Sequence, residues 1–294
     1  MKLQTQLHLM ILPALILIVI YAYGPMLGLV MAFQEFNPAS GWLHSEWVGL
    51  ENFSYIFLLP NFVKVLWNTL FISFMEIVIG QVLAIVITLL LNEVYNRYIK
   101  GGIQTIIYLP HFLSWVIMGG ILLEVLSLED GIVNRMLTGI GIAQVPFLGD
   151  PKVFPWTLIF SHIWKEVGFA TIVLLASLTG INPTLYEAGK IDGAGKLKLT
   201  WHVTLPGMAP VIILVSVLSI GNLLNAGFEQ VMTLYNPVVY ETGDIIDTFV
   251  YRLGLVQARY SLAAAVGLFK SFVSLTLVSL SYFLAYRLAN YRIF

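Results

Sequence analysis

Four ionisable residues stand out within the apolar segments of this chain and are the first candidates for chemistry. They are Glu76, Lys165, Glu166 and Lys270, and each lies within a hydrophobic run. Charged groups in such a setting are costly unless they face a cavity or an oppositely charged partner. They therefore predict either the polar lining of a solute path or a buried ion pair that fixes helix packing. Glu166 or Glu76 paired with Lys270 is one such arrangement.

Amide and aromatic side chains form a second group of candidates. Asn222, Asn225 and Gln230 follow one another closely in the sequence. Amides both donate and accept hydrogen bonds, which suits the hydroxyl groups of sugars, and Trp164 could supply an apolar face for a sugar ring. The same amides could instead join helices to one another. Helix packing is the stronger of these two interpretations.

Other chemistries find no support in the sequence. The chain contains no cysteine, which excludes disulfides and thiol catalysis, and it lacks a G-x-x-x-x-G-K-[ST] phosphate loop. The histidines show no close metal-ligand spacing, and the sequence contains no nucleophile–base cluster worth naming. We therefore predict that the chain is not an enzyme and has neither catalytic residues, a metal site nor a cofactor. If ATP drives it, another chain hydrolyses the ATP.

The composition predicts a membrane protein. Of the 294 residues, 59% are hydrophobic and 11% are charged, and the mean hydropathy is +0.87. A soluble domain carries roughly 25% charged residues. This chain cannot cover a water-facing surface of the usual kind and belongs in lipid. The net charge of −1 gives no indication of nucleic-acid binding.

The apolar segments predict an all-α polytopic protein with six transmembrane helices. Each segment is near the ~20 residues needed to cross a bilayer, and Pro110 is expected to kink the third. We divide the chain into 1–61, the first helix and an outer loop, and 62–294, a five-helix core. The predicted spans are approximately 7–33, 62–91, 103–125, 154–179, 207–228 and 261–288.

The distribution of charge predicts the orientation. Lysine and arginine are denser in the short segments 92–100 and 182–206, whereas acidic residues gather in the longer segments on the other side. Because cytoplasmic loops carry the excess of basic residues, both termini and the 182–206 segment are expected to be cytoplasmic. The predicted location is the inner, or cytoplasmic, membrane of the cell.

The 182–206 segment predicts a helix–turn–helix. Asn182 followed by Pro183 is a typical helix start. A short helix is expected over 184–191 and a second over 194–203, separated by Asp192 and Gly193, since glycine tolerates the positive φ of such a turn. Pro206 is expected to open the next apolar segment.

This loop resembles the EAA loop of ABC importer permeases, in the type I or MetI-like fold. Gly189 stands where the family has alanine, and Val203 where it has isoleucine; both departures are conservative. The residues that carry the resemblance are Glu187, Ala188, Gly189, Asp192, Gly193, Ala194, Val203, Leu205 and Pro206. The resemblance implies that the loop docks on an ATPase and couples its closure to the spans.

Further residues resemble the oligosaccharide branch of these permeases, the branch that includes LplB-like and alginate or pectin-oligosaccharide permeases. Among them are Trp164-Lys165-Glu166 and Gly227-Phe228-Glu229-Gln230. The resemblance implies a sugar importer with alternating access. It also implies a second homologous permease in a heterodimer, an ABC ATPase dimer on the cytoplasmic side and an extracytoplasmic sugar-binding protein. An ABC permease for a non-sugar solute, or a secondary transporter driven by an ion gradient, remains the alternative.

Overall fold

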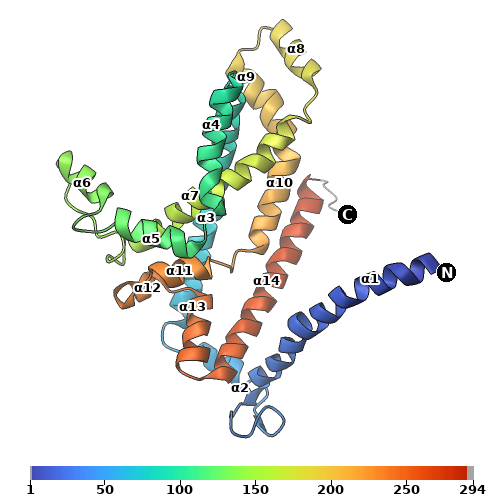
Figure 1. Ribbon diagram of the computed structural model, residues 1–294, viewed down its shortest axis with the longest axis vertical. Helices are drawn as coiled ribbons and strands as arrows, with labels where there is room; N and C mark the ends of the chain where they lie inside the picture. Colours follow the sequence, from blue (N-terminus) through green and yellow to red (C-terminus); the bar gives the residue numbers. More distant parts are fainter. Residues whose placement is uncertain (1, 290–294) are drawn as a thin grey trace. The chain divides into compact units, whose positions relative to one another are not determined.

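The computed structural model describes residues 2–289, and residue 1 and residues 290–294 lie outside this range. Within it the chain is mainly helical (Figure 1). It also contains one antiparallel pair of two-residue strands, β1 (Gln34–Glu35) and β2 (Glu46–Trp47). The helices are α1 (Lys2–Ile18), α2 (Glu51–Ile56), α3 (Phe62–Asn92), α4 (Arg97–Tyr108), α5 (Trp115–Val125), α6 (Ile132–Gly139), α7 (Phe154–Leu178), α8 (Pro183–Ile191), α9 (Lys196–Leu199), α10 (Leu205–Gly221), α11 (Phe228–Leu234), α12 (Tyr240–Gly243), α13 (Ile246–Tyr251) and α14 (Tyr260–Ala289).

The all-α membrane fold is confirmed, with corrections to the third and fifth spans. Among residues 2–289, five helical segments are long and apolar enough to cross a membrane. They are His8–Phe33, Phe62–Asn92, Phe154–Leu178, Lys196–Gly221 and Tyr260–Phe283. The predicted third span is instead broken into Arg97–Phe112 and Trp115–Val125, which meet at a bend of 106°. The predicted proline kink was too mild, because Leu113 is extended and Ser114 starts a new helix by accepting a hydrogen bond from the Ile117 N–H at 3.3 Å.

The predicted end of the helix–turn–helix was wrong. Its second helix begins at Lys196 and does not stop near Pro206, but continues into α10. A π-helical turn over Thr200–Thr204 makes this possible, and in it the Leu205 N–H donates to the Thr200 carbonyl. Proline removes one helical donor and crowds the preceding turn, and a local widening of the helix relieves both effects.

The fifth span ends earlier than predicted, and the segment after it is not a polar loop. The helix ends at Gly221, so Asn222 and Asn225 lie in the connection to α11. Beyond it, α11 and α13 bury apolar side chains such as Val231 and Ile246. At the surface Lys64 donates a hydrogen bond to Glu241, which lowers the pKa of that carboxyl group. Because both side chains are exposed, the pair adds little stability.

The described residues form two compact units. One contains the residues up to Phe62 together with Phe249–Phe272, and the other contains Val63–Thr248 with the residues from Val273 onward. In the first unit, Asn52 Nδ2 donates to the Ala32 and Gln34 carbonyl oxygens, both at 3.0 Å, and ties α2 to the strand pair. The predicted division into 1–61 and 62–294 places its boundary at nearly the same residue but assigns 249–272 differently.

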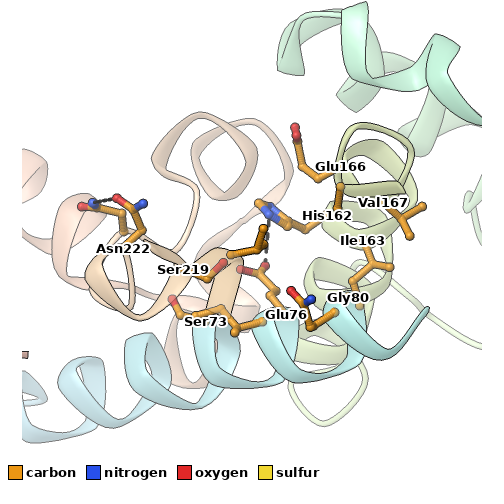
Figure 2. A pocket seen from close by; sticks show the side chains of 14 residues that line it. Ser73, Glu76, Gly80, His162, Ile163, Glu166, Val167, Ser219 and Asn222 are labelled. Atoms are coloured by element: carbon orange, nitrogen blue, oxygen red, sulfur yellow. Dashed lines mark hydrogen bonds and ion pairs between the residues drawn. The ribbon is translucent and has the colours of Figure 1, made fainter. Parts of the chain in front are cut away.

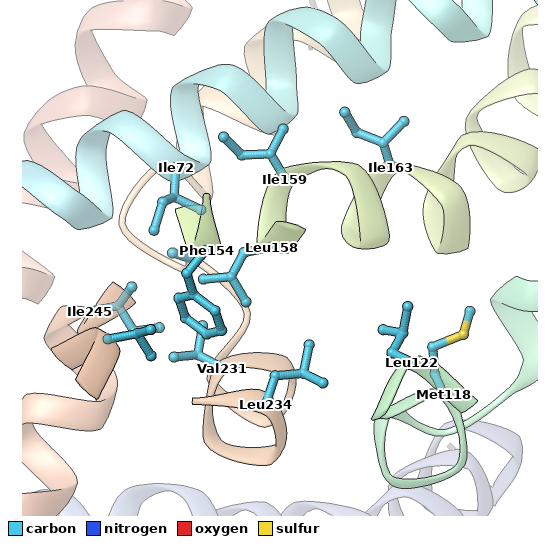
Figure 3. Close-up of a cluster of buried hydrophobic side chains, with 12 residues drawn as sticks. Ile72, Met118, Leu122, Phe154, Leu158, Ile159, Ile163, Val231, Leu234 and Ile245 are labelled. Atoms are coloured by element: carbon cyan, nitrogen blue, oxygen red, sulfur yellow. The ribbon is translucent and has the colours of Figure 1, made fainter. Parts of the chain in front are cut away.

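The core of the second unit lies where α7 meets α3, α5 and α11. Its largest side chain is Phe154, which is fully buried at the start of α7 (Figure 3). The cluster contains Ile72, Met118, Leu122, Phe154, Leu158, Ile159, Ile163, Ala226, Val231, Leu234, Val239 and Ile245. Because α7 supplies residues throughout this cluster, it is the element that positions the polar groups described below.

Candidate functional site

A cavity of about 330 Å³ lies between α3, α7 and the end of α10 (Figure 2). Helical periodicity accounts for the faces that meet there. On α3, Ser73, Glu76 and Gly80 follow one another at intervals of three and four residues, which places them on one side of the helix. The lining comprises Ser73, Glu76, Ile77, Gly80, Gln81, His162, Ile163, Glu166, Val167, Ala170, Val215, Ser219, Asn222 and Asn225.

Glu76 and His162 face each other across this cavity. The Glu76 Oε1 and His162 Nδ1 atoms are 3.8 Å apart, and the Glu76 side chain is buried (Figure 2). This separation allows a charge interaction but exceeds a normal hydrogen bond. Within the described part of the chain neither atom has a hydrogen-bond partner, and the same holds for Ser73 Oγ and Gln81 Nε2. Buried polar groups usually have partners, so these atoms mark a place that a polar molecule could occupy.

A second polar group fixes the break between α4 and α5 against α7. Glu166 accepts from Lys165 Nζ at 3.1 Å and lies 2.8 Å from His111 Nδ1. Lys165 Nζ also donates to the His111 carbonyl oxygen at 2.9 Å, and the His111 ring stacks on Phe169 with centroids 4.7 Å apart. Lys165 and Glu166, adjacent in sequence, therefore share one partner segment rather than facing lipid.

The predicted path residues are brought together only in part. Glu76, Glu166, Asn222 and Asn225 all line the cavity. Gln230 is instead fully buried, and its Nε2 donates to the Leu158 carbonyl at 2.7 Å and to Ser161 Oγ at 2.8 Å. That geometry joins α11 to α7, as expected for an amide that packs helices.

The remaining predicted residues lie elsewhere. Trp164 lines a separate, mostly apolar hollow of about 400 Å³ together with Trp156 and Phe160. Lys165 is buried beside Glu166 and does not appear on the cavity wall. Lys270 lies on α14 in the other compact unit, and its pairing with Glu76 or Glu166 stays a prediction. A role of any of these residues in a solute path also stays a prediction.

Sequence reasoning missed four polar residues of the cavity, Ser73, Gln81, His162 and Ser219. His162 precedes Glu166 by four residues and so shares its face of α7, while Ser73 precedes Glu76 by three on α3. Gln81 follows Glu76 by five residues and also reaches the wall. The helical spacing was visible in the sequence, but only the packing of α3 on α7 shows that the two faces meet.

The predicted helix–turn–helix stands at one end of the second unit (Figure 1). Asn182 caps α8 by accepting from the Thr184 N–H at 3.0 Å, and Gly193 has a φ of +76°. Both features agree with the sequence prediction for this loop. At Gly189 an added Cβ would lie 2.6 Å from Leu199 Cδ2, so the glycine lets α8 approach the following helix closely.

The loop presents a mixed charged and apolar surface. Glu187, Ala188 and Asp192 are exposed. Beside them Ile191 is 86% exposed and Leu197 87% exposed, and the sequence analysis did not single out either residue. Apolar side chains exposed together with a carboxylate are typical of a protein–protein contact surface. This surface therefore suits docking rather than catalysis.

Comparison with known proteins agrees with this picture. Residues 77–291 match the family described as "Binding-protein-dependent transport system inner membrane component". The chain is 42% identical over 278 residues to the polygalacturonan/rhamnogalacturonan transport system permease protein YteP of Bacillus subtilis strain 168, covering 95% of this chain and 87% of that protein. It is 39% identical over 272 residues to protein LplB of the same organism, covering 92% and 86%.

A solved structure shares the fold over nearly the whole length. It is a bacterial ABC transporter involved in the import of the acidic polysaccharide alginate, and one of its chains is 40% identical with a TM-score of 0.90. The match covers 98% of this chain and 97% of that one. A second structure of such a transporter, in complex with alginate pentasaccharide-bound periplasmic protein, gives a TM-score of 0.89.

The broken third span, the long apolar helices and the projecting loop together define a transport permease that is integral to the membrane. The chain belongs to the family of inner-membrane components of binding-protein-dependent ABC transport systems. This assignment confirms the MetI-like fold expected from the loop residues. As a member of this family, the chain is a transport permease.

Proposed function

We propose that this chain is one permease subunit of an ATP-driven importer for sugars, in particular oligosaccharides, and that it works by alternating access. The observation that carries the coupling part of the proposal is the exposed helix–turn–helix, in which Glu187, Ile191 and Leu197 form an unpartnered surface beside the turn at Gly193. Because the second helix of this pair continues into α10, a displacement of this surface can be transmitted to a membrane span.

The proposed partners follow from the need for an ATPase, for the rest of the solute path and for a protein that delivers the solute. An ABC ATPase dimer docks on the loop and binds the ATP, so this chain itself needs no cofactor. A second homologous permease completes the pathway as a heterodimer, and an extracytoplasmic sugar-binding protein delivers the solute. The loop and both termini lie in the cytoplasm, as the distribution of basic residues indicates.

The cavity of α3, α7 and α10 supports sugar as the solute. Its wall combines the amides Asn222 and Asn225 with Ser73 and Ser219, side chains that both donate and accept hydrogen bonds. Hydroxyl-rich solutes require that combination. Relatives that are named as permeases for polygalacturonan/rhamnogalacturonan and for arabinooligosaccharides point to the same class.

The test is ATP hydrolysis by the reconstituted complex of this chain, its partner permease, the ATPase and the binding protein. We expect one class of oligosaccharide to stimulate hydrolysis and Glu187→Arg to abolish the stimulation, because reversal of the charge opposes docking. Glu129→Arg is the matched control, since Glu129 is exposed in the turn that follows α5, outside the loop.

The alternatives give different results in the same assay. Stimulation by an oxyanion or an amino acid, but by no sugar, would keep the ABC permease and refute the substrate class. Uptake that follows an ion gradient without any response of ATP hydrolysis would indicate a secondary transporter and overturn the proposal.

A further inference from the structure

The polar atoms left without partners around the cavity include both donors and acceptors. Glu76 Oε1 accepts, Gln81 Nε2 donates, and Ser73 Oγ and His162 Nδ1 can do either. All of them belong to α3 and α7, the two helices that face each other there. A ligand that satisfies this set must itself alternate donors and acceptors over a short distance, as vicinal hydroxyl groups do.

The rest of the wall is apolar and small. Ile77, Ile163, Val167 and Val215 contribute aliphatic surface between the polar groups. The volume of about 330 Å³ lies at the lower end of the roughly 300–1,000 Å³ typical of small-molecule sites. Such a wall suits the C–H face of a single sugar ring better than a long stretch of chain.

The cavity wall offers no lysine or arginine to a bound anion. Among the described residues that line it, the acidic ones are Glu76 and Glu166, and no lysine or arginine is present. The nearby Lys165 directs its Nζ to the His111 carbonyl and to Glu166. A proton on His162 would be balanced by Glu76 at 3.8 Å. A free carboxylate entering this cavity would lose its hydration and meet no cation in exchange.

We infer that the cavity between α3, α7 and α10 holds an uncharged, hydroxyl-rich sugar ring and excludes a ring that carries a free carboxylate. The inference rests on the proposed import of oligosaccharides and narrows it. It distinguishes this cavity from what the alginate transporter would suggest, since that structural relative imports an acidic polysaccharide. The cavity discriminates against an acidic ring because it offers no cation to the carboxylate, and not because of its shape. The preference for an uncharged ring should therefore change when a cation is added to the wall.

The test compares two probes with the same skeleton, trigalacturonate and its fully methyl-esterified form. Binding of each to the purified complex of both permeases and the ATPase is measured by calorimetry, without ATP and without the binding protein. We expect the ester to bind at least about tenfold more tightly than the acid, as a carboxylate without a cation partner would require.

A matched pair of variants at Ser219 tests whether the missing cation causes the preference. Ser219 is suitable because it lines the cavity and is uncharged. Ser219→Lys supplies the missing cation and is expected to reduce the preference for the ester about tenfold. Ser219→Gln adds similar bulk without charge and should leave the preference unchanged. Equal or tighter binding of the acid by the wild type, or the same response of both variants, would overturn the inference.

Failure of this inference can be separated from failure of the proposed function. If neither probe binds, the cavity is not a sugar site and the inference is wrong. The stimulation of ATP hydrolysis by a sugar-loaded binding protein, and its loss in Glu187→Arg, still tests import independently. If ATP hydrolysis never responds to a sugar, the proposed function itself fails.

Discussion

At the scale of single residues, Gly168 sets how closely α4 approaches α7. A Cβ atom at this position would lie 2.3 Å from the Ile107 carbonyl oxygen and 3.0 Å from the Tyr108 Cα. These are backbone atoms, which cannot rotate away as the end of a side chain can. Gly168→Ala should therefore separate the helices and lower the free energy of unfolding by about 1–3 kcal/mol, the usual cost of overpacking.

The measurement is thermal unfolding of the purified protein in detergent. Gly102→Ala on α4 is the matched control, because no atom lies within 4 Å of its added Cβ. The control should be neutral or stabilising by up to about 1 kcal/mol, since alanine favours helix over glycine. Equal melting temperatures for the two variants would contradict the close approach of α4 to α7.

The turn at Gly193 is a second position where one residue decides local structure. Its φ of +76° is a region that costs an ordinary residue about 1–2 kcal/mol. Gly195, two residues later, has a φ of −73° and precedes α9 as its N-cap. Gly193→Ser should therefore change the angle between α8 and α9 and reduce sugar-stimulated ATP hydrolysis, whereas Gly195→Ser should not, because serine is a good N-cap. Equal activity of both variants would refute the role of this turn.

At the scale of elements, the broken third span depends on the polar group at Glu166. Lys165 is buried, and removing it leaves Glu166 with one fewer partner. Breaking a fully buried pair costs about 3–5 kcal/mol, but the Glu166 side chain is 35% exposed, so we expect about 2 kcal/mol for Lys165→Met. Unfolding in detergent measures this loss.

A double-mutant cycle separates the pair from the packing of each side chain. Lys165→Met combined with Glu166→Gln should cost less than the sum of the single changes, because the carboxylate that needs a partner is gone. Strict additivity would show that the contact of 3.1 Å between these groups contributes nothing. In that case the other contacts of His111, such as its stacking on Phe169, would hold the break.

The elements that could be predicted from the sequence are those fixed locally. Long apolar runs define α3, α7 and α14 within a residue or two, and Asn182 with Pro183 defines the start of α8. The size of the bend at Ser114 could not be predicted, because an isolated proline permits either a mild kink or a complete break in the helix. The helices after Gly227 were missed because their burial depends on contacts with α5 and α7, far away in the sequence.

The residues of the candidate site also divide into those that the local sequence indicates and those that only the packing of helices reveals. Glu76 and Glu166 were singled out because a charge within an apolar run is a signal in itself. His162 carries no such signal, since histidine is common in many settings, and it gains meaning only from its position opposite Glu76. Gln230 was linked to neighbouring amides by sequence distance, yet the end of α10 at Gly221 places it in a different helix from the one expected.

At the scale of the whole molecule, the spans differ in how much of their surface the chain itself covers. Half of the most apolar window of α7 is buried, whereas in His8–Phe33 none is. An apolar helix whose surface is uncovered by its own chain requires lipid or another subunit around it. The first span is therefore the one whose environment lies outside this chain, and α7 is the one that the rest of its unit surrounds.

Whether the broken pair crosses the membrane can be tested directly, because the chain has no cysteine. Single cysteines at Ser40, Tyr95 and Glu129, all exposed, report the side of three successive loops. With cytoplasmic termini and six crossings, an impermeant maleimide should label Ser40→Cys and Glu129→Cys in wall-stripped cells, and Tyr95→Cys only after permeabilisation. If Glu129→Cys behaves like Tyr95→Cys instead, the 106° bend returns the chain to the same side and the pair is re-entrant. Labelling of Tyr95→Cys in intact cells would reverse the predicted orientation, and the helix–turn–helix would then lie on the side without an ATPase.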